Sequence, residues 1–492
     1  MKILLSWARR PSDPDIGILI DRLEKEGNPV VYFVGAPTDK TRASGATFHS
    51  YIDAGKAIPA PTVDPSQFEP MGKDTIRKLY HVESIVLTMM NRFFDPLCVD
   101  ERRRIYYEML RYWRGVLLTF TPDAVIFPNM PHFVYDYILY ELAHLLGIKT
   151  ILFDDTRFPG RLLMFTDFEQ LTQALKTELA RADGRSKSAR TLAEDIREYY
   201  EPRSRRDFNA IPSYIEYQKK KYTLWQFNLP WVSIKKSLRD LSFVQKAPRY
   251  IGWLFREKSI PLARTAYTHL SYPFLSNLKK EYTALERPPD FSKRFVYFPL
   301  QMQPEKTTSP QGNMFVDQLL ALETVSAAVP AGVSIYVKEH PLQWLRFGIR
   351  FNSSRYRGYY ARIARMKNVM LIPLYSNSYQ LINKSIAVSA VTGSAGWEAA
   401  LRGKPSIIFG TVWYQDCPGV FSVFDTESCR QAFETIRNGY VVGEQRVISY
   451  LHCFERVTIR AFIAPTAGRV STVSKEECMR NISEAVIQEL KK

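Results

Sequence analysis

Cysteine is scarce in this chain of 492 residues, and the few cysteines are not grouped. They form no Cys-x-x-Cys pair: Cys98, Cys417, Cys429, Cys453 and Cys478. An odd, scattered set is typical neither of a disulfide framework nor of a zinc site. We therefore expect reduced thiols, as in a cytoplasmic protein, and no structural metal.

Long hydrophobic runs are also missing. No stretch approaches the roughly 18 uninterrupted apolar residues of a membrane-spanning helix. The first apolar residues, Met1–Trp7, are soon followed by Arg9 and Arg10 and are too few for the core of a signal peptide. The sequence predicts a protein of the cytoplasm that contacts a membrane only from its surface.

Acidic residues are too few to balance the basic ones: 50 Asp and Glu stand against 67 Lys and Arg, a net charge of +17. Between residues 211 and 280 there are 13 Lys and Arg against 3 Asp and Glu, an excess of 10. Trp225, Phe227 and Trp231 lie among these cations, a mixture typical of a surface that docks on anionic lipid. We expect 211–280 to bind the inner face of the plasma membrane. A solvated connector is the alternative, and a nucleic acid partner is not expected, because no nucleic-acid-binding module is recognisable.

Several familiar catalytic motifs are absent. The sequence has no HExxH, no Walker loop, no GxGxxG after a strand and no GxSxG. Its single Asp-x-Asp, Asp13-Pro14-Asp15, stands before a helical pattern and is interpreted as a helix cap. We therefore expect neither a metal nor a cofactor.

Strand and helix signals alternate at both ends of the sequence. The apolar runs "KILLSW", "PVVYFVG" and "KTILFDD" lie between helical patterns in the first part, and "RFVYFPL", "VSIYVKEHP", "NVMLIP", "IAVSAVTG" and "PSIIFG" do so after residue 290. Such alternation predicts an α/β fold, with parallel sheets in two Rossmann-like domains facing a cleft. The expected units are an N-terminal Rossmann-like domain (1–160), a helical, basic aromatic connector (161–290), a C-terminal Rossmann-like domain (291–425) and a helical tail (426–492).

Polar clusters follow three strands of the second predicted domain. Because ligands of open parallel sheets bind beyond the carboxyl ends of the strands, the three clusters predict one binding rim. Their chemistry suits a nucleotide phosphate and its sugar. The candidate donor-binding residues are Gln301, Gln303, Thr307, Thr308, Lys338, Thr392, Gly393, Ser394, Ala395, Gly396 and Glu398.

Structural alternatives exist for several of these residues. Ser394 opens a helix whose N–H groups can hold a phosphate, or it simply caps that helix. Glu398 accepts from ribose hydroxyls, or it is an ordinary acid near a helix start. His340, fixed at the strand end by Pro341, is expected to donate to a phosphate or leaving group. Lys338 binds phosphate or pairs with its neighbour Glu339 on the surface.

Carboxylates are the candidate catalytic groups. Glu305, close to expected cations, should stay ionised and act as base or nucleophile at an anomeric carbon, with helix capping as the alternative. Asp154 or Asp155, after a strand of the first domain, can exchange a proton with an acceptor hydroxyl. Arg157 and His132 are expected on the acceptor side. An Asp–Arg pair in an ordinary polar loop is the alternative.

The stretches "YFPLQMQPEKTTSP", "VKEHP" and "VTGSAGWEAALRGKPSIIFG" resemble the bacterial capsule polysaccharide biosynthesis family, which includes β-Kdo transferases. The resemblance covers about 293–415 well and 121–160 loosely. It implies a metal-independent glycosyltransferase of the two-domain GT-B type. The family's Gln-x-x-x-Asp motif is matched by Gln301–Glu305 with Glu in place of Asp, and its His-Pro by His340-Pro341.

By this resemblance, Glu305 stands at the anomeric carbon, His340 contacts a cytidylate phosphate, and Ser394 fits the serine motif that follows. The implied donor is a nucleotide-activated sugar, such as CMP-linked Kdo or a related acid sugar, and the acceptor is a glycan or lipid-linked glycan. The alternatives are a UDP-sugar 2-epimerase, a polyol-phosphate polymerase of the teichoic acid type and a non-enzymatic adaptor on membrane or RNA. The polymerases usually show Asp-Tyr-Ser-Ser where this chain has Val391–Ser394.

Overall fold

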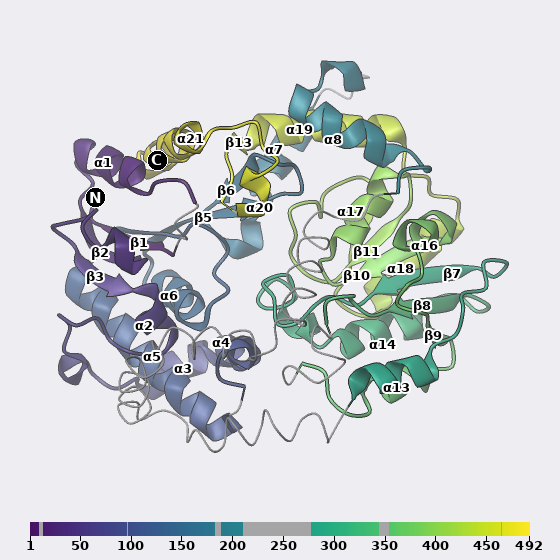
Figure 1. Ribbon diagram of the computed structural model, residues 1–492, viewed down its shortest axis with the longest axis horizontal. Coiled ribbons are helices and arrows are strands. Elements are labelled where there is room, and N and C mark those ends of the chain that lie inside the picture. The colour runs from purple at the N-terminus through teal and green to yellow at the C-terminus, as the bar shows by residue number, and fades with distance from the viewer. Residues whose placement is uncertain (9–12, 96, 183–187, 210–276, 344–353, 464) are drawn as a thin grey trace, which may run out of the picture.

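The computed structural model describes residues 1–8, 13–95, 97–182, 188–209, 277–343, 354–463 and 465–492. It contains two β-sheets, one of seven and one of six strands, in two lobes that lie side by side (Figure 1). Helices cover both sheets. The predicted α/β class with two Rossmann-like domains is confirmed.

The first sheet is parallel except at one edge. Its spatial order is β13-β6-β5-β4-β1-β2-β3. The strands are β1 (Ile3–Trp7), β2 (Val30–Gly35), β3 (Thr47–Ser50), β4 (Ala124–Ile126), β5 (Lys149–Asp155), β6 (Arg161–Phe165) and β13 (Ile459–Arg460), of which β6 and β13 pair antiparallel. Every residue of β1 is buried, as expected for a strand covered on both faces.

Helices lie on both faces of this sheet. On one face, α1 (Gly17–Lys25) and α21 (Lys475–Leu490) share a core with β1 and β5. On the other face, α4 (Tyr80–Met89), α5 (Val99–Phe120) and α6 (Val134–Leu145) pack together, with α2 (Tyr51–Gly55) and α3 (Lys73–Lys78) nearby. The helical path between α3 and α4 is broken at Leu79, whose carbonyl accepts from the Tyr106 hydroxyl at 3.1 Å.

The second sheet is parallel throughout, in the order β12-β11-β10-β7-β8-β9. Its strands are β7 (Phe295–Pro299), β8 (Ser334–Lys338), β9 (Val369–Leu371), β10 (Ala387–Ala390), β11 (Ser406–Ile408) and β12 (Val420–Ser422). Its helices are α13 (Leu278–Leu285), α14 (Gln318–Ala328), α15 (Tyr359–Ala364), α16 (Ser378–Lys384), α17 (Ser394–Leu401) and α18 (Thr426–Arg437). The strand order reverses between β7 and β10, so the loops after these two strands flank the position where open sheets bind ligands.

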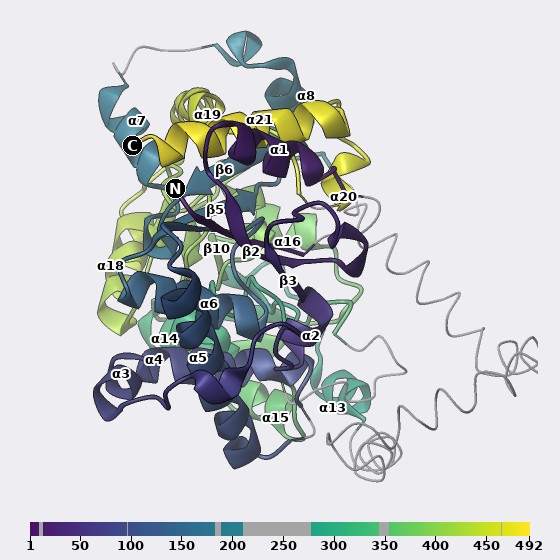
Figure 2. The same cartoon turned by 90° about the vertical axis from the view of Figure 1, so that its left-hand side faces the viewer.

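The chain crosses between the lobes more than once. β6 completes the first sheet beyond the expected boundary at 160, and α18 packs on α14 in the second lobe beyond the expected boundary at 425. The C-terminal part then returns: β13 joins the first sheet and α21 lies along α1 (Figure 2). The remaining helices are α7 (Gln173–Arg181), α8 (Glu194–Ser204), α19 (Glu444–Val457) and α20 (Pro465–Gly468). The residues 426–492 are therefore divided between both lobes.

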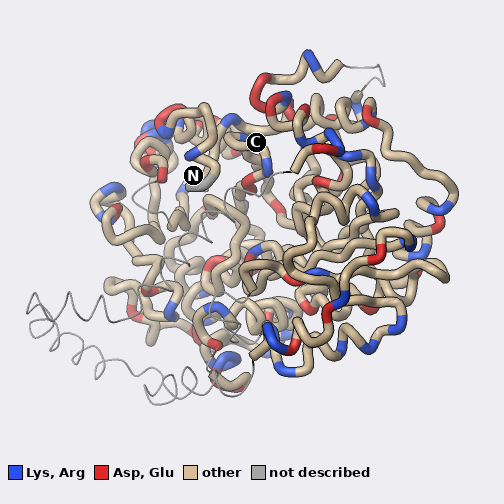
Figure 3. Tube along the Cα trace, turned by 45° about the vertical axis from the view of Figure 1, so that its right-hand side comes forward, with Lys and Arg blue, Asp and Glu red and all other residues tan. Residues whose placement is uncertain are grey.

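Within the described residues, none of the helices is long and apolar enough to cross a membrane. Lys and Arg are interspersed with Asp and Glu along the described trace (Figure 3). Most of the basic segment 211–280 lies outside the described residues. The predicted helical connector and its contact with membrane therefore stay predictions.

Candidate active site

The carboxyl ends of the two sheets are joined through the loop that follows β7. Lys306 in this loop donates to the Asp154 carboxylate at the end of β5 (2.5 Å) and to Asn129 after β4 (2.8 Å). In the same loop, the Ser309 hydroxyl lies 3.0 Å from the hydroxyl of Thr88 on α4. The loop that carries Glu305 is thus held against the first domain.

Gln301 and Gln303, predicted to bind the donor, are buried inside this loop. The Gln301 amide donates to the Thr392 hydroxyl (3.2 Å) and accepts from the Thr392 N–H (2.8 Å). Gln303 donates to a backbone carbonyl, and its amide oxygen accepts from Gln318 (2.8 Å) and Arg355 (2.5 Å). These two glutamines therefore shape the loop from within.

The threonines of the rim support the same framework. The Thr308 hydroxyl donates to the Glu305 carbonyl (2.9 Å), and the Thr392 hydroxyl donates to the Thr307 carbonyl. Thr308 and Thr392 are buried. The Thr392 bond joins the loop after β10 to the loop after β7, and the Thr308 bond holds the backbone that follows Glu305 within that loop.

A buried ion pair that was not predicted from the sequence supports the end of β8. Arg355 donates to Glu339 at 2.8 Å, and the Tyr360 hydroxyl donates to the same carboxylate at 2.6 Å. Burial lowers the pKa of Arg355, but Glu339 outweighs this and the net shift is upward. A signal existed in the sequence, because a glutamate that ends a buried strand needs a buried cation. Nothing in the sequence identifies Arg355 as that cation.

His340 is held in one tautomer. Its Nδ1 accepts from the Leu342 N–H at 3.3 Å. Burial lowers the pKa of His340 to about 4, and the Glu339 charge only partly opposes this shift. At neutral pH the ring is therefore uncharged, with its proton on Nε2, where it can donate to a phosphate oxygen.

Lys338 and Glu339 are both buried, so the alternative of an ion pair on the surface is wrong. Lys338 is buried, and its ammonium group donates to the Ser376 carbonyl (2.8 Å) and the Ser378 hydroxyl (2.5 Å). These partners belong to the loop after β9 and the start of α16. Lys338 therefore ties neighbouring loops of the rim together.

The Glu305 side chain is exposed, yet the protein around it removes enough water to raise the pKa of its carboxyl. The cations Arg157, Arg92 and Lys306 counteract this shift. The cationic surroundings that we expected are present, but desolvation is the larger effect on the pKa. No described residue has the Glu305 carboxylate as a helix cap.

The helix α17 opens with Gly393 as its N-cap and without a side-chain cap, so the interpretation of Ser394 as the cap is wrong. Ser394 and Ala395 form the first turn and are partly exposed. Gly396 is buried, and a Cβ there would lie 2.5 Å from the Ser406 Oγ and 2.7 Å from the Tyr414 hydroxyl. The second glycine therefore serves close packing and donates its own N–H to the Gly393 carbonyl (3.1 Å), while the N–H groups of Ser394 and Ala395 stay available to an anion.

The predicted residues of the first domain are divided between two places. Asp154 is buried in its ion pair with Lys306. Asp155 accepts from the Ile463 N–H at 3.2 Å and thus faces the returning C-terminal segment. The structure therefore does not bring Asp155 together with Glu305.

His132, after β4, is held in the opposite tautomer to His340. Its Nδ1 donates to the Met130 carbonyl at 2.8 Å. Burial lowers the pKa of His132 to about 3, helped by the charges of Lys306 and Arg92. These two cations also act on Glu305, so both side chains lie around the same pair of charges. The neutral ring leaves Nε2 as a proton acceptor.

Arg157, in the turn between β5 and β6, connects the two sides of the site. Its charge lowers the pKa values of Glu305 and Glu398, whereas burial raises them by more. For His340, the charge of Arg157 and burial both lower the pKa. These three residues belong to three different loops or helices of the second domain. The acceptor-side residue Arg157 therefore faces the donor-side rim.

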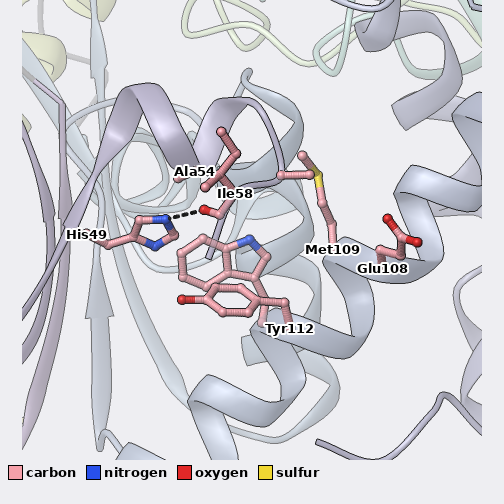
Figure 4. A pocket seen from close by; sticks show the side chains of 8 residues that line it. His49, Ala54, Ile58, Glu108, Met109 and Tyr112 are labelled. Carbon is pink, nitrogen blue, oxygen red and sulfur yellow. Dashed lines mark hydrogen bonds between the residues drawn. The ribbon is translucent and has the colours of Figure 1, made fainter. Parts of the chain in front are cut away.

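A pocket elsewhere in the first domain has a different character (Figure 4). It holds about 20 Å³, space for roughly one water molecule. His49 donates to the Ile58 carbonyl (2.9 Å) and accepts from the Tyr32 hydroxyl (2.9 Å), which is linked to Tyr112 and the Ala60 N–H. Because each group in this series of hydrogen bonds has a partner, we interpret the network as structural.

In the part of the chain that the structure describes, no three His, Cys, Asp or Glu side chains gather as metal ligands would.

Residues 210–431 match the model of a family described as "Capsule polysaccharide biosynthesis protein". No curated protein matches the sequence. Among solved structures, the Thermosulfurimonas dismutans KpsC β-Kdo 2,4 transferase is 12% identical, with 67% of this chain and 79% of that chain covered and a TM-score of 0.32. The UDP-GlcNAc 2-epimerase from Methanocaldococcus jannaschii is 11% identical, with 99% and 100% covered and a TM-score of 0.23. TM-scores this low give neither likeness any weight for activity.

The family match includes all three rim clusters of the second domain. It also begins at residue 210 and so covers the basic segment, in which no motif of the family is recognisable. The resemblance to the capsule polysaccharide biosynthesis family that was predicted over 293–415 is thus confirmed, and the loose resemblance over 121–160 lies outside the match.

Proposed function

We propose that this protein is a glycosyltransferase of surface or capsular polysaccharide biosynthesis. It transfers a sugar from a nucleotide-activated donor to a glycan or lipid-linked acceptor. The observation that supports this proposal is the loop after β7, which carries Glu305 on the second domain and is bound through Lys306 to Asp154 and Asn129 of the first. A donor on the rim of the second sheet would face an acceptor on the first.

In this proposal, the Nε2–H of His340 donates a hydrogen bond to the leaving phosphate. The positive charge of Arg157 and the N–H groups at the start of α17 neutralise the charge that develops there. This role passes to Arg157 from Lys338, whose ammonium group is occupied by Ser376 and Ser378. Together these groups supply what a metal ion supplies in other transferases, so we propose transfer without a metal.

Bond formation needs a proton acceptor. The acceptor hydroxyl oxygen forms the new bond to the anomeric carbon while the bond from that carbon to the phosphate oxygen breaks. The hydroxyl donates a hydrogen bond to Nε2 of His132, and its proton passes to the Glu305 carboxylate, whose pKa is raised by burial. Asp154 stays in its ion pair with Lys306 and positions the loop.

The family resemblance supports Kdo or a related acid sugar as the donor sugar. The basic aromatic segment 211–280 supports a cytoplasmic location at the inner face of the plasma membrane. A UDP-sugar 2-epimerase is the alternative function, and it would release a free product without any acceptor.

Calorimetric titration with CMP, CDP, UDP and GDP tests the proposal. We expect at least one nucleotide to bind, and His340→Ala to weaken that binding about tenfold or more, since a hydrogen bond to a charged phosphate is lost. His81→Ala is the matched control, because His81 is an exposed histidine on α4. If none of the four nucleotides binds, the transferase proposal is wrong.

Measuring turnover as well as binding distinguishes the catalytic role of Glu305 from the roles of the residues that bind the nucleotide. With the donor sugar of the nucleotide that binds, we expect Glu305→Gln to lower kcat about 100-fold or more and to change nucleotide affinity by less than about threefold. Glu323→Gln, at an exposed position on α14, should change neither. A free sugar epimer formed without acceptor would instead support the epimerase.

A further inference from the structure

A second group of charged side chains lies along α17, deeper than the rim. Ser394 and Glu398 lie four residues apart on one face of the helix, and Arg402, four residues further on, is its C-cap. Ser394 and Glu398 are partly exposed on this face, whereas their neighbours Trp397 and Ala399 are buried. The face therefore leads from the proposed phosphate position to Arg402.

Arg402 is buried, with 4% of its surface exposed, but it is not satisfied. One guanidinium N–H donates to the Glu398 carbonyl at 2.8 Å, while Nε and Nη2 have no hydrogen-bond partner. Its planar group lies over the rings of Tyr379 (4.6 Å) and Phe208 (5.9 Å). Unpaired N–H groups of a buried cation are costly, so this arrangement favours an anionic oxygen.

Two further arginines surround Glu398 from other elements. Arg203 on α8 lies 4.0 Å over the Tyr199 ring and 5.3 Å from that of Phe208. Like Arg402 and Arg157, Arg203 lowers the pKa of Glu398 against the larger effect of burial. α8 packs against α17 in the upper right of Figure 1, so the arginines come together from three elements.

The charges of this cluster do not balance. Arg203 and Arg402 both act on the one carboxylate of Glu398, and among the described residues neither has an ion pair closer than 4.0 Å. Both guanidinium groups lie over aromatic rings, where water screens their charge poorly. Such a site attracts an anion that can accept several hydrogen bonds.

We propose that Arg157, Arg203 and Arg402 form a second anion subsite beside Glu398, which binds an additional anionic group of the donor. This inference rests on the proposed function. The shared chemistry is an oxyanion, either the second phosphate of a nucleoside diphosphate or the carboxylate of an acid sugar on a nucleoside monophosphate. Arginine suits both, since its fork of N–H groups matches either oxyanion.

The test compares ligands with one and two anionic groups. Wild type and Arg203→Ala are titrated by calorimetry with CMP, CDP and the acid-sugar nucleotide CMP-N-acetylneuraminate, and with UMP and UDP. In wild type we expect one of the doubly anionic ligands to bind about tenfold or more tightly than its monophosphate. Arg203→Ala should remove that advantage and change monophosphate affinity by less than about twofold.

Arg205→Ala is the matched control, because Arg205 carries the same charge past the end of α8 and pairs with Asp207; it should keep the wild-type advantage. If CDP or UDP binds more tightly than its monophosphate, the subsite binds the second phosphate. If the acid-sugar nucleotide binds more tightly than CMP, the subsite binds the carboxylate. Binding of the monophosphate alone, or an equal advantage in wild type and Arg203→Ala, overturns the subsite and leaves the transferase proposal standing. Failure of all these ligands and of GDP overturns both. Arg402→Lys, which keeps the buried charge but not the fork, should show the same loss as Arg203→Ala.

Discussion

At the scale of single residues, hydrogen bonds to the backbone decide what each histidine offers. His340 accepts from an N–H through Nδ1, whereas His132 donates to a carbonyl through Nδ1. Because both rings are neutral, one presents a donor at Nε2 and the other an acceptor. The same residue type thus serves the leaving phosphate on one side of the site and the attacking hydroxyl on the other.

The lowered pKa of His132 predicts a loss of stability in acid. Its pKa is about 3 in the folded protein and about 6.5 in an unfolded chain. Between these values the unfolded chain binds the additional proton, so stability that is present above about pH 6.5 is lost as the pH falls. His132→Asn keeps a donor for the Met130 carbonyl and cannot titrate. From pH 7 to pH 5, we expect wild type to lose about 2 kcal/mol more than this variant.

Urea unfolding followed by tryptophan fluorescence at both pH values measures this difference. His81→Asn is the control, because the Glu141 carboxylate raises the pKa of His81 and its removal should not protect the protein in acid. Equal losses in wild type and His132→Asn would show that His132 is not neutral in the folded state.

At the scale of elements, the sequence predicts the buried strands better than the exposed strand β12 and the cap of α17. All five strands expected after residue 290 are present, because each is a short apolar run buried on both faces. β12 was missed, since Val420–Ser422 is partly exposed and carries little apolar signal. The cap of α17 was uncertain because Gly393 and Ser394 are both acceptable N-cap residues, and only backbone geometry distinguishes them.

Partners in the site were the least predictable feature. Arg355 and Glu339 are 16 positions apart, and Lys306 and Asp154 are 152 positions apart. Periodicity and strand ends place such residues on a rim, but which cation meets which carboxylate depends on how the two sheets face each other. The sequence therefore predicted which residues lie on the rim. Only the structure shows which of them are buried and hold the loops in place, and which are exposed to a ligand.

The close packing of α17 predicts that Gly396→Ala destabilises the second domain. The new methyl group would meet the Ser406 Oγ and the Tyr414 hydroxyl, which donates to the Gly393 carbonyl at 2.5 Å. We expect a loss of about 1–3 kcal/mol in the free energy of unfolding. The same substitution in a Tyr414→Phe background should cost less, since one obstructing atom is gone. Gly45→Ala, where a Cβ meets nothing within 4 Å, should stay within about 0.5 kcal/mol in the same urea titration.

At the scale of the whole molecule, the site depends on how the two sheets are held together. The returning C-terminal segment adds β13 to the first sheet and α21 to α1, while α18 packs in the second lobe. One continuous stretch of chain therefore fastens both lobes. Close to the site, the bond from Lys306 to Asp154 and Asn129 performs the same task with side chains.

This arrangement predicts that Lys306→Met affects both stability and activity. Asp154 has only 3% of its side chain exposed, so losing its partner leaves a buried charge unpaired and costs about 3–5 kcal/mol. Adding Asp154→Asn removes that charge and should restore most of the stability. Activity should stay low in the double variant, because neither side chain then holds the Glu305 loop against the first domain.

Unfolding in urea and donor turnover, measured on the same three proteins, distinguish the two effects. Lys293→Met is the control, since the Lys293–Asp290 pair is exposed and 3.7 Å apart, and such pairs contribute about 0–1 kcal/mol. If the double variant regained both stability and turnover, the bridge would be only a stabilising contact. If the double variant regained stability but not turnover, transfer would require the Glu305 loop to be held between the sheets. In that case the fold would be intact, and only the distance between donor and acceptor would no longer be fixed.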